Sequence, residues 1–186
     1  MTNFKLWVIR MFLPIVVLSS GTVYGDVMID DFEAGSNVDW DYLSDQVMGG
    51  VSEGSARLGR DENEAYAHMT GDVSTANNGG FIQLRTSLKS GADKNTKGVF
   101  IKVRGNNQKY YIHLRTRGTM LPWQYYQGGF DATEEWQLVR LPFEAFEASG
   151  SWLRNTPAPT SIRSIGVVAY GRDHQADIQI SEIGFY

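Results

Sequence analysis

The sequence has no cysteine among its 186 residues. Disulfide bonds, thiolate metal sites and thiol catalysis are therefore excluded, and stability has to come from core packing. Basic tracts are missing too, and the formal net charge is −4. Because nucleic-acid binding relies on neutralising many phosphates, this charge pattern argues against nucleic acid as a partner.

Catalytic and cofactor signatures are also missing. The three histidines, His68, His113 and His174, show none of the close pairings that zinc sites use. The sequence contains no phosphate-binding loop, dinucleotide fingerprint or nucleophile elbow. The two catalytic carboxylates of a glycoside hydrolase can be far apart in sequence and come together only in the fold. An enzyme that acts on a glycan therefore remains an alternative. We predict a protein that is not an enzyme and that uses no cofactor.

The first 25 residues have the pattern of an export signal. Lys5 and Arg10 give a positive start, a short apolar run follows, and no acidic residue precedes Asp26. The run is too short for a comfortable transmembrane helix. We predict a cleaved signal at 1–25 and a periplasmic or extracellular chain at 26–186, without an integral membrane segment. An uncleaved anchor and a mitochondrial transit peptide are the alternatives.

Short runs of alternating apolar and polar residues fill the rest of the chain, and no long amphipathic helix is indicated. Strands are expected near 27–33, 53–59, 65–73, 79–88, 99–104, 110–117, 122–130, 136–141, 165–170 and 178–183, with one helical turn at 143–146. Turn signals such as Asn77-Asn78-Gly79-Gly80 separate these runs. With 20 glycines, this spacing predicts an all-β fold: a single antiparallel β-sandwich of the jelly-roll type.

The strand expected at 110–117 offers a polar face that could bind a ligand. Its apolar residues must face the core, so the alternate residues share the opposite face. Arginine forks and aromatic rings suit a sugar or a partner protein. The candidate binding residues are Arg85, His113, Arg115, Arg117, Trp123 and Tyr125. The alternative is a solvated face whose arginines pair with carboxylates, and binding requires Arg85 and Arg115 to be neighbours.

The stretch from Ser44 to Ser52 carries the most distinctive local signal. Met48-Gly49-Gly50 predicts a tight turn in which the paired glycines take positive φ. Asp45 and Ser52 flank this turn and can bond its backbone amides. Gly50→Val should then destabilise the fold, because a β-branched side chain is poorly tolerated at positive φ.

Five aspartates within sixteen positions raise the alternative of a Ca²⁺ site, since this ion takes oxygen ligands from loops. They are Asp30, Asp31, Asp39, Asp41 and Asp45. No EF-hand spacing is present, and aspartate commonly caps turns. We therefore predict no metal site among these residues.

The turn belongs to a longer series of motifs that resembles one family. The motifs are Asp31-Phe32, Ser44 to Ser52, Gly79-Gly80-Phe81 with Leu84-Arg85-Thr86, Tyr110 to Thr116, Trp136 to Phe143, Ser164-Ile165-Gly166 and Ile183 to Tyr186. In order and spacing they resemble the complex I intermediate-associated protein family, the thirty-kilodalton assembly-factor type. The resemblance covers nearly all of the chain after residue 26.

The resemblance implies a galactose-binding-like sandwich and a non-catalytic, chaperone-like helper that holds intermediates of respiratory complex I. Within its signature, Asp45, Gly49, Gly50 and Ser52 are expected to pin the turn. We expect an exported binding module that acts through protein contacts, with membrane complex subunits as the partner class. From its loop position near Ser149-Gly150-Ser151, Trp152 is a candidate for an exposed contact residue.

A carbohydrate-binding module of the cell envelope, using the arginine and aromatic face, is the alternative, and its support is fold analogy. The two functions predict different surfaces. Sugar binding predicts a concave groove with exposed aromatic rings. Protein binding predicts a flatter patch.

Overall fold

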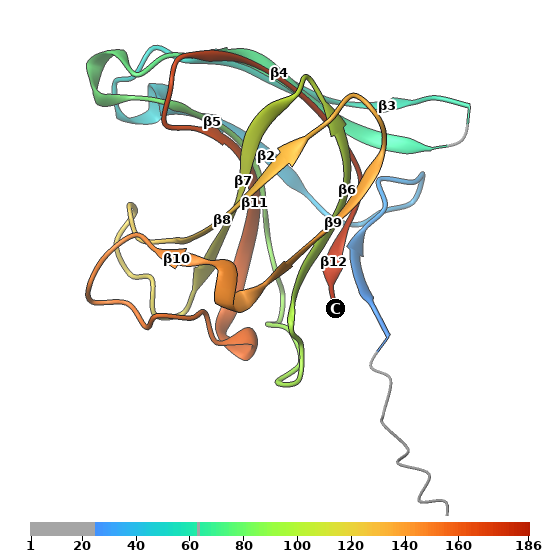
Figure 1. The fold of residues 1–186 in the computed structure, drawn as a ribbon, viewed down its shortest axis with the longest axis vertical. Coiled ribbons are helices and arrows are strands. Elements are labelled where there is room, and N and C mark those ends of the chain that lie inside the picture. Colours follow the sequence, from blue (N-terminus) through green and yellow to red (C-terminus); the bar gives the residue numbers. More distant parts are fainter. Residues whose placement is uncertain (1–24, 63) are drawn as a thin grey trace, which may run out of the picture.

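Two antiparallel β-sheets, each of six strands, make up the computed structural model of the protein (Figure 1). The structure describes residues 25–62 and 64–186, so the predicted signal peptide lies, apart from Gly25, outside the described residues. No described helix is long and apolar enough to cross a membrane. The two antiparallel sheets confirm the predicted all-β sandwich.

Sheet A has the strand order β3-β4-β12-β6-β9, with β1 also paired to β12. Its strands are β1 (Val27–Asp30), β3 (Glu53–Arg60), β4 (Ala65–Val73), β6 (Gly98–Gly105), β9 (Gln137–Pro142) and β12 (His174–Phe185). Sheet B has the order β10-β8-β7-β11-β5-β2. Its strands are β2 (Trp40–Ser44), β5 (Phe81–Ser87), β7 (Gln108–Thr116), β8 (Tyr126–Ala132), β10 (Glu147–Ala148) and β11 (Ile162–Tyr170).

The alternation pattern predicts most of these strands but misses β2 and β10. Both lie at the edges of sheet B, and each pairs with a single neighbour. Most of the side chains of β2 are half-buried, so its sequence lacks the alternation of apolar and polar residues that predicts a strand. The strand expected at 122–130 begins only at Tyr126. The predicted helical turn is present as the 3₁₀ turn η3 (Phe143–Ala145).

The core lies between the sheets and is built by alternate residues of the strands. In β7, Tyr110, Ile112 and Leu114 are completely buried, while the residues between them point to the other side of sheet B. In β12 of sheet A, Ile178 and Ile180 are likewise completely buried in this core. Each such side chain contributes about 1.5–3 kcal/mol through its burial, so the alternation fixes which side of each sheet faces outward.

Asp45 connects the two sheets at one end of the sandwich. It opens the 3₁₀ turn η1 (Asp45–Met48), which leads from β2 of sheet B to β3 of sheet A. Its fully buried carboxylate accepts hydrogen bonds from Ser52 N at 2.9 Å, Ser52 Oγ at 2.5 Å and Gly80 N at 2.5 Å. Ser52 Oγ accepts a further bond, from Ser74 N, at 3.0 Å. One side chain thus holds the entries to both β3 and β5.

The two glycines of this turn have different roles. Gly49 is left-handed, with φ of 91°, whereas Gly50 does not have positive φ, so the expectation for Gly50 is wrong. A Cβ at Gly50 would lie 2.2 Å from Asp45 Cγ, and one at Gly79 would lie 2.3 Å from Asp45 Oδ2. Gly50→Val is still expected to destabilise the fold, because the buried carboxylate occupies the space that a side chain would need.

The hydrogen bonds also control the charge of Asp45. Burial alone would raise the pKa of its carboxyl, but the bonds from Ser52, Gly80 and Phe81 outweigh this effect and lower the pKa. The folded pKa therefore lies below the unfolded value of about 3.9. The stabilisation that the ionised Asp45 carboxylate gives the folded state is fully present above the unfolded pKa. It is lost as the pH falls through the folded pKa.

We expect Asp45→Asn to lower the free energy of unfolding by about 2–4 kcal/mol at pH 7, because an amide cannot accept bonds at both positions and buried donors lose their partner. Urea unfolding checks this. Asp72→Asn, on an exposed part of β4, is the matched control and should change stability little. Equal stability of the two variants would contradict the role given to Asp45.

Candidate functional site

The outward side of sheet B, called face B here, brings Arg85 and Arg115 into one neighbourhood. Gly166 of β11 lies opposite Arg85 on one side and His113 on the other, and the next outward position, Ser164, lies opposite Arg115. Burial lowers the pKa of Arg115, and the guanidinium charges of Arg163 and Arg85 lower it further. Arg85 and Arg115 are therefore on the same face and act on each other electrostatically, although β11 lies between their strands.

A connected group of aromatic rings lies beside these arginines. Tyr125 stacks on His113 with ring centroids 4.1 Å apart and an interplanar angle of 10°. Its hydroxyl also meets that of Tyr170 at 3.2 Å, and Tyr170 packs edge-on against Tyr111 with ring centroids 6.1 Å apart. The sequence pattern predicts the alternating positions of β7 but gives no reason to include Tyr170, which comes from β11.

Gln83 adds an amide to the same face. A Cβ at Gly166 would lie 2.2 Å from Gln83 Nε2, so the absence of a side chain at Gly166 lets the amide cross the centre of the face. Val168 is completely buried although it belongs to the outward set, opposite Tyr111 and Gln83. Side chains therefore cover this face closely, and its chemistry is that of rings, amides and guanidinium groups.

His113, one of the candidate binding residues, is buried. It is only 8% exposed, lies under the ring of Tyr125, and its Nε2 bonds Gln127 Oε1 at 2.9 Å. Burial lowers its pKa to about 4, although the bond to Gln127 acts in the opposite direction. The imidazole is therefore neutral at pH 7 and serves as an uncharged support for Tyr125.

Two other predicted site residues lie apart from the strand. β7 ends at Thr116, so Arg117 lies in the following turn, exposed and not on face B as the alternation predicts. Trp123 lies in the loop between β7 and β8 and is 64% exposed. The structure therefore groups Arg85, His113 and Arg115 with Tyr125, and places Trp123 in the loop that leads to Tyr125.

An exposed apolar surface adjoins face B. We call it the loop patch; its members are Met120, Leu121, Trp123 and Trp152. Ser149 joins the two loops that carry it, because its Oγ donates to Trp123 O at 3.0 Å and accepts from Tyr125 N at 2.9 Å. Both loops lie at the left of the view, beside β10 (Figure 1). Trp152 is 94% exposed, as expected, whereas sequence reasoning misses Met120 and Leu121.

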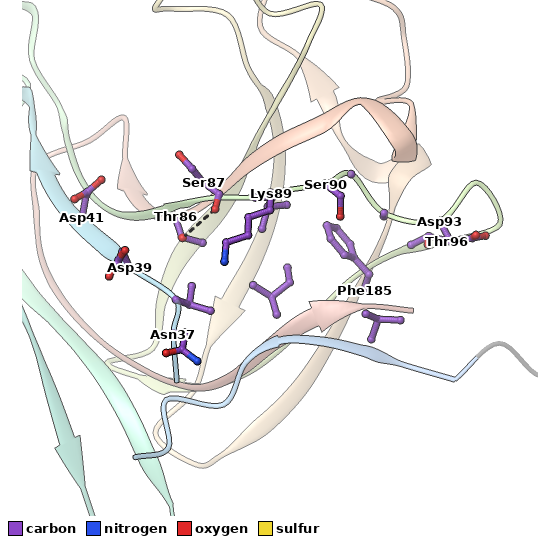
Figure 2. Close-up of a pocket in the computed structure, with 16 residues that line it drawn as sticks. Asn37, Asp39, Asp41, Thr86, Ser87, Lys89, Ser90, Asp93, Thr96 and Phe185 are labelled. Carbon is purple, nitrogen blue, oxygen red and sulfur yellow. Dashed lines mark hydrogen bonds between the residues drawn. The ribbon is translucent and has the colours of Figure 1, made fainter. Parts of the chain in front are cut away.

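Hollows lie in several parts of the surface. One cavity of about 620 Å³ is walled by apolar residues such as Val38 and Phe185, with Asp39 and Lys89 among its polar residues (Figure 2). A second, of about 870 Å³, lies beside Trp40. A third, of about 490 Å³, is lined by Ser149, Ser151 and Leu153, in the loop that carries Trp152. The rings of Tyr111, His113 and Tyr125 line none of these three cavities.

The early aspartates do not converge on one point. Asp30 accepts bonds from Trp40 Nε1 at 2.7 Å and Phe32 N at 2.9 Å, while Asp45 closes the turn η1. Within the described part of the chain, no group of three histidine or carboxylate side chains is arranged to hold a metal ion. These carboxylates instead fix local backbone, which is the other role aspartate commonly takes.

Comparison with known proteins gives one family and one fold. The family described as complex I intermediate-associated protein 30 matches residues 31–181. No curated protein matches the chain. Similar solved structures include the family 11 carbohydrate-binding module of the cellulosomal cellulase Lic26A-Cel5E of Clostridium thermocellum, at 16% identity and a TM-score of 0.69, covering 87% of this chain and 94% of that one.

Two further solved structures share the architecture. A family 11 module from Clostridium thermocellum in complex with a β-1,3-1,4-mixed-linked tetrasaccharide has 16% identity and a TM-score of 0.68, covering 87% of this chain and 95% of that one. A family 30 carbohydrate-binding module has 11% identity and a TM-score of 0.54, covering 74% and 91%. At identities this low, the likeness establishes the fold and not a ligand.

The buried His113 predicts a pH dependence of stability. Its folded pKa of about 4 lies below the unfolded value of about 6.5, so the stabilisation is fully present above pH 6.5 and is lost as the pH falls toward 4. Between pH 7 and pH 5 the wild type should lose about 2 kcal/mol of unfolding free energy through this residue.

Urea unfolding of wild type and His113→Phe at the two pH values measures that contribution. The phenyl ring keeps the stack on Tyr125 but does not titrate, so the variant should lose less stability than the wild type between pH 7 and pH 5. An identical loss in both proteins would show that His113 is not a buried neutral group.

Proposed function

The chain belongs to the complex I intermediate-associated protein 30 family, and on that basis we propose that it is an exported, non-catalytic binding module that acts through protein contacts. Its contact surface is face B together with the loop patch. The observation that carries this proposal is the exposure of four large apolar side chains on two tied loops. Exposed apolar groups that gather in one place commonly mark a site that a partner covers.

The composition of the surface supports the same function. Tryptophan, tyrosine and arginine are the residues that most often dominate the energy of protein interfaces. Here Arg115 Nη2 donates to Leu121 O at 2.8 Å, in the loop that carries Trp123. Ser149 ties Tyr125 N to the loop that carries Trp152.

The class of partner follows from the family and from the predicted export. The family's name refers to association with complex I intermediates. An exported chain meets such a complex only on the outer side of the membrane. The proposed partner is therefore a membrane subunit of a respiratory complex that exposes a segment on that side.

Glycan binding is the second candidate, and one specific observation favours it. The rings of Tyr111, Tyr125 and Tyr170 adjoin the uncharged amides of Gln83 and Gln127, and uncharged donors and acceptors suit sugar hydroxyls. The fold is shared with carbohydrate-binding modules. A glycan on face B would leave the loop patch uncovered, which is why this candidate comes second.

Site-specific photocrosslinking in cells tests the proposal. A photoreactive residue replaces Trp123 or Trp152 in the full-length chain, and in the control it replaces Leu138, which is 53% exposed on the outward side of sheet A. We expect crosslinks to respiratory-chain membrane subunits from the two loop positions and a much weaker signal from Leu138.

Equal crosslinking from all three positions, or recovery of envelope and glycan-processing proteins alone, would contradict the proposal. A parallel thermal-shift assay with mixed-linked β-glucan separates the second candidate. A rise in melting temperature that Tyr125→Ala removes, without membrane subunits in the crosslinked products, would favour glycan binding instead.

A further inference from the structure

Two guanidinium groups meet at one backbone oxygen next to face B. Thr119 O accepts a hydrogen bond from Arg163 Nη2 at 2.8 Å and a weaker one from Arg115 Nη2 at 3.4 Å. Arg163 reaches this position because β11 has a register irregularity between Ile162 and Ser164. Alternation alone therefore gives no indication that Arg163 joins this site.

Arg85 adds a third positive charge on the same face. It lies opposite Gly166 of β11, and Arg115 lies opposite Ser164, two residues along the same strand. The charges of Arg163 and Arg85 both act on Arg115 and lower its pKa. We call Arg85, Arg115 and Arg163 the arginine trio. Because like charges repel, holding two further guanidinium groups within reach of Arg115 is unfavourable unless negative charge offsets them.

No carboxylate of the described residues forms an ion pair with the trio. The ion pairs in residues 25–62 and 64–186 use other cationic residues, namely Arg60, His68, Lys102, Arg104 and Arg140. All five belong to sheet A. Asp41 lies opposite Arg85 in the β2–β5 register, yet the two make no ion pair. The expectation that face B is a solvated surface of paired arginines is therefore not met.

Donor capacity is also left over within the trio. Arg115 Nη2 donates to the carbonyl oxygens of Thr119 and Leu121, but Arg115 Nε is buried without a hydrogen-bond partner. A buried donor without a partner is unfavourable. A carboxylate that approached Arg115 and Arg163 together would reduce the repulsion between them and supply acceptors of the kind that guanidinium forks prefer.

We propose that the arginine trio binds carboxylates of an acidic segment of the partner protein, while an apolar side chain next to those carboxylates covers the loop patch. This inference rests on the proposed function and names the chemistry of its partner. The two parts of the surface are continuous, because Arg115 Nη2 donates to Leu121 O within the loop that also carries Met120 and Trp123. An acidic polysaccharide offers carboxylates but no apolar side chain, so a protein segment fits better.

The test uses purified full-length protein and three probes. The first is a fluorescein-labelled peptide of repeated Glu-Glu-Leu, the second has glutamine in place of glutamate, and the third is polygalacturonate at equal carboxylate concentration. We expect the Glu-Glu-Leu peptide to bind most tightly. Arg85→Gln with Arg163→Gln should weaken that binding by about tenfold or more. Arg115 is left in place because it bonds two carbonyls of the loop, Thr119 O and Leu121 O, and keeps the loop held when Arg163 is changed.

Arg60→Gln with Arg140→Gln is the matched control, since it removes the same charge from sheet A. It should change the affinity less than about threefold, because exposed charges that do not touch the ligand act mainly through screened long-range attraction. In urea unfolding, the face B double variant should have a midpoint close to that of the wild type, because the relieved repulsion offsets the lost bond from Arg163 Nη2 to Thr119 O. Its loss of binding would then not come from loss of fold.

Equal weakening by the two double variants would overturn the inference, because binding would then follow net charge alone. Tighter, trio-dependent binding of polygalacturonate would also overturn it, in favour of an acidic glycan. The proposed function can fail separately. If Trp123 and Trp152 crosslink to no membrane subunit while the peptide still binds through the trio, the proposed function fails and the acidic-segment site remains.

Discussion

The buried carboxylate of Asp45 is the interaction on which the rest of the structure depends. It bonds the backbone at Ser52, where the chain enters sheet A, and at Gly80, where the chain enters β5 of sheet B. The two sheets share a core but no hydrogen-bond ladder, so such a tie sets how one sheet lies on the other. The glycines at 50 and 79 are required because their side-chain space belongs to this carboxylate.

The proposed contact surface follows from that arrangement. β5 begins beside the Asp45 tie and carries Arg85 to the centre of face B, where Gly166 separates it from His113. The two outward faces then differ in charge balance. On sheet A, Lys102, Arg104 and Arg140 pair with carboxylates, whereas Arg115 and Arg163 beside face B donate to backbone oxygens. A surface of arginines and aromatic rings bordered by exposed tryptophans has the composition of an interface.

Sequence reasoning predicts the features that depend on local alternation. The core face of β7 and the outward positions of Arg85 and Arg115 are examples, because each follows from a period of two. It cannot predict what depends on irregular backbone or on pairing between distant strands. Arg163 joins its neighbours through a bulge, and Tyr170 meets Tyr125 across strands, so neither follows from spacing. The burial of His113 is missed because a loop residue covers it.

The proposed function requires face B and the loop patch to form the contact surface of the protein. The most direct measurement is quantitative recovery of partner subunits with the tagged full-length chain, comparing Trp123→Ala/Trp152→Ala with Leu58→Ala/Leu138→Ala. Both pairs remove exposed apolar side chains, but the second pair lies on sheet A. The account predicts that recovery of respiratory membrane subunits falls at least several-fold in the tryptophan pair alone. Equal recovery from both variants would contradict it.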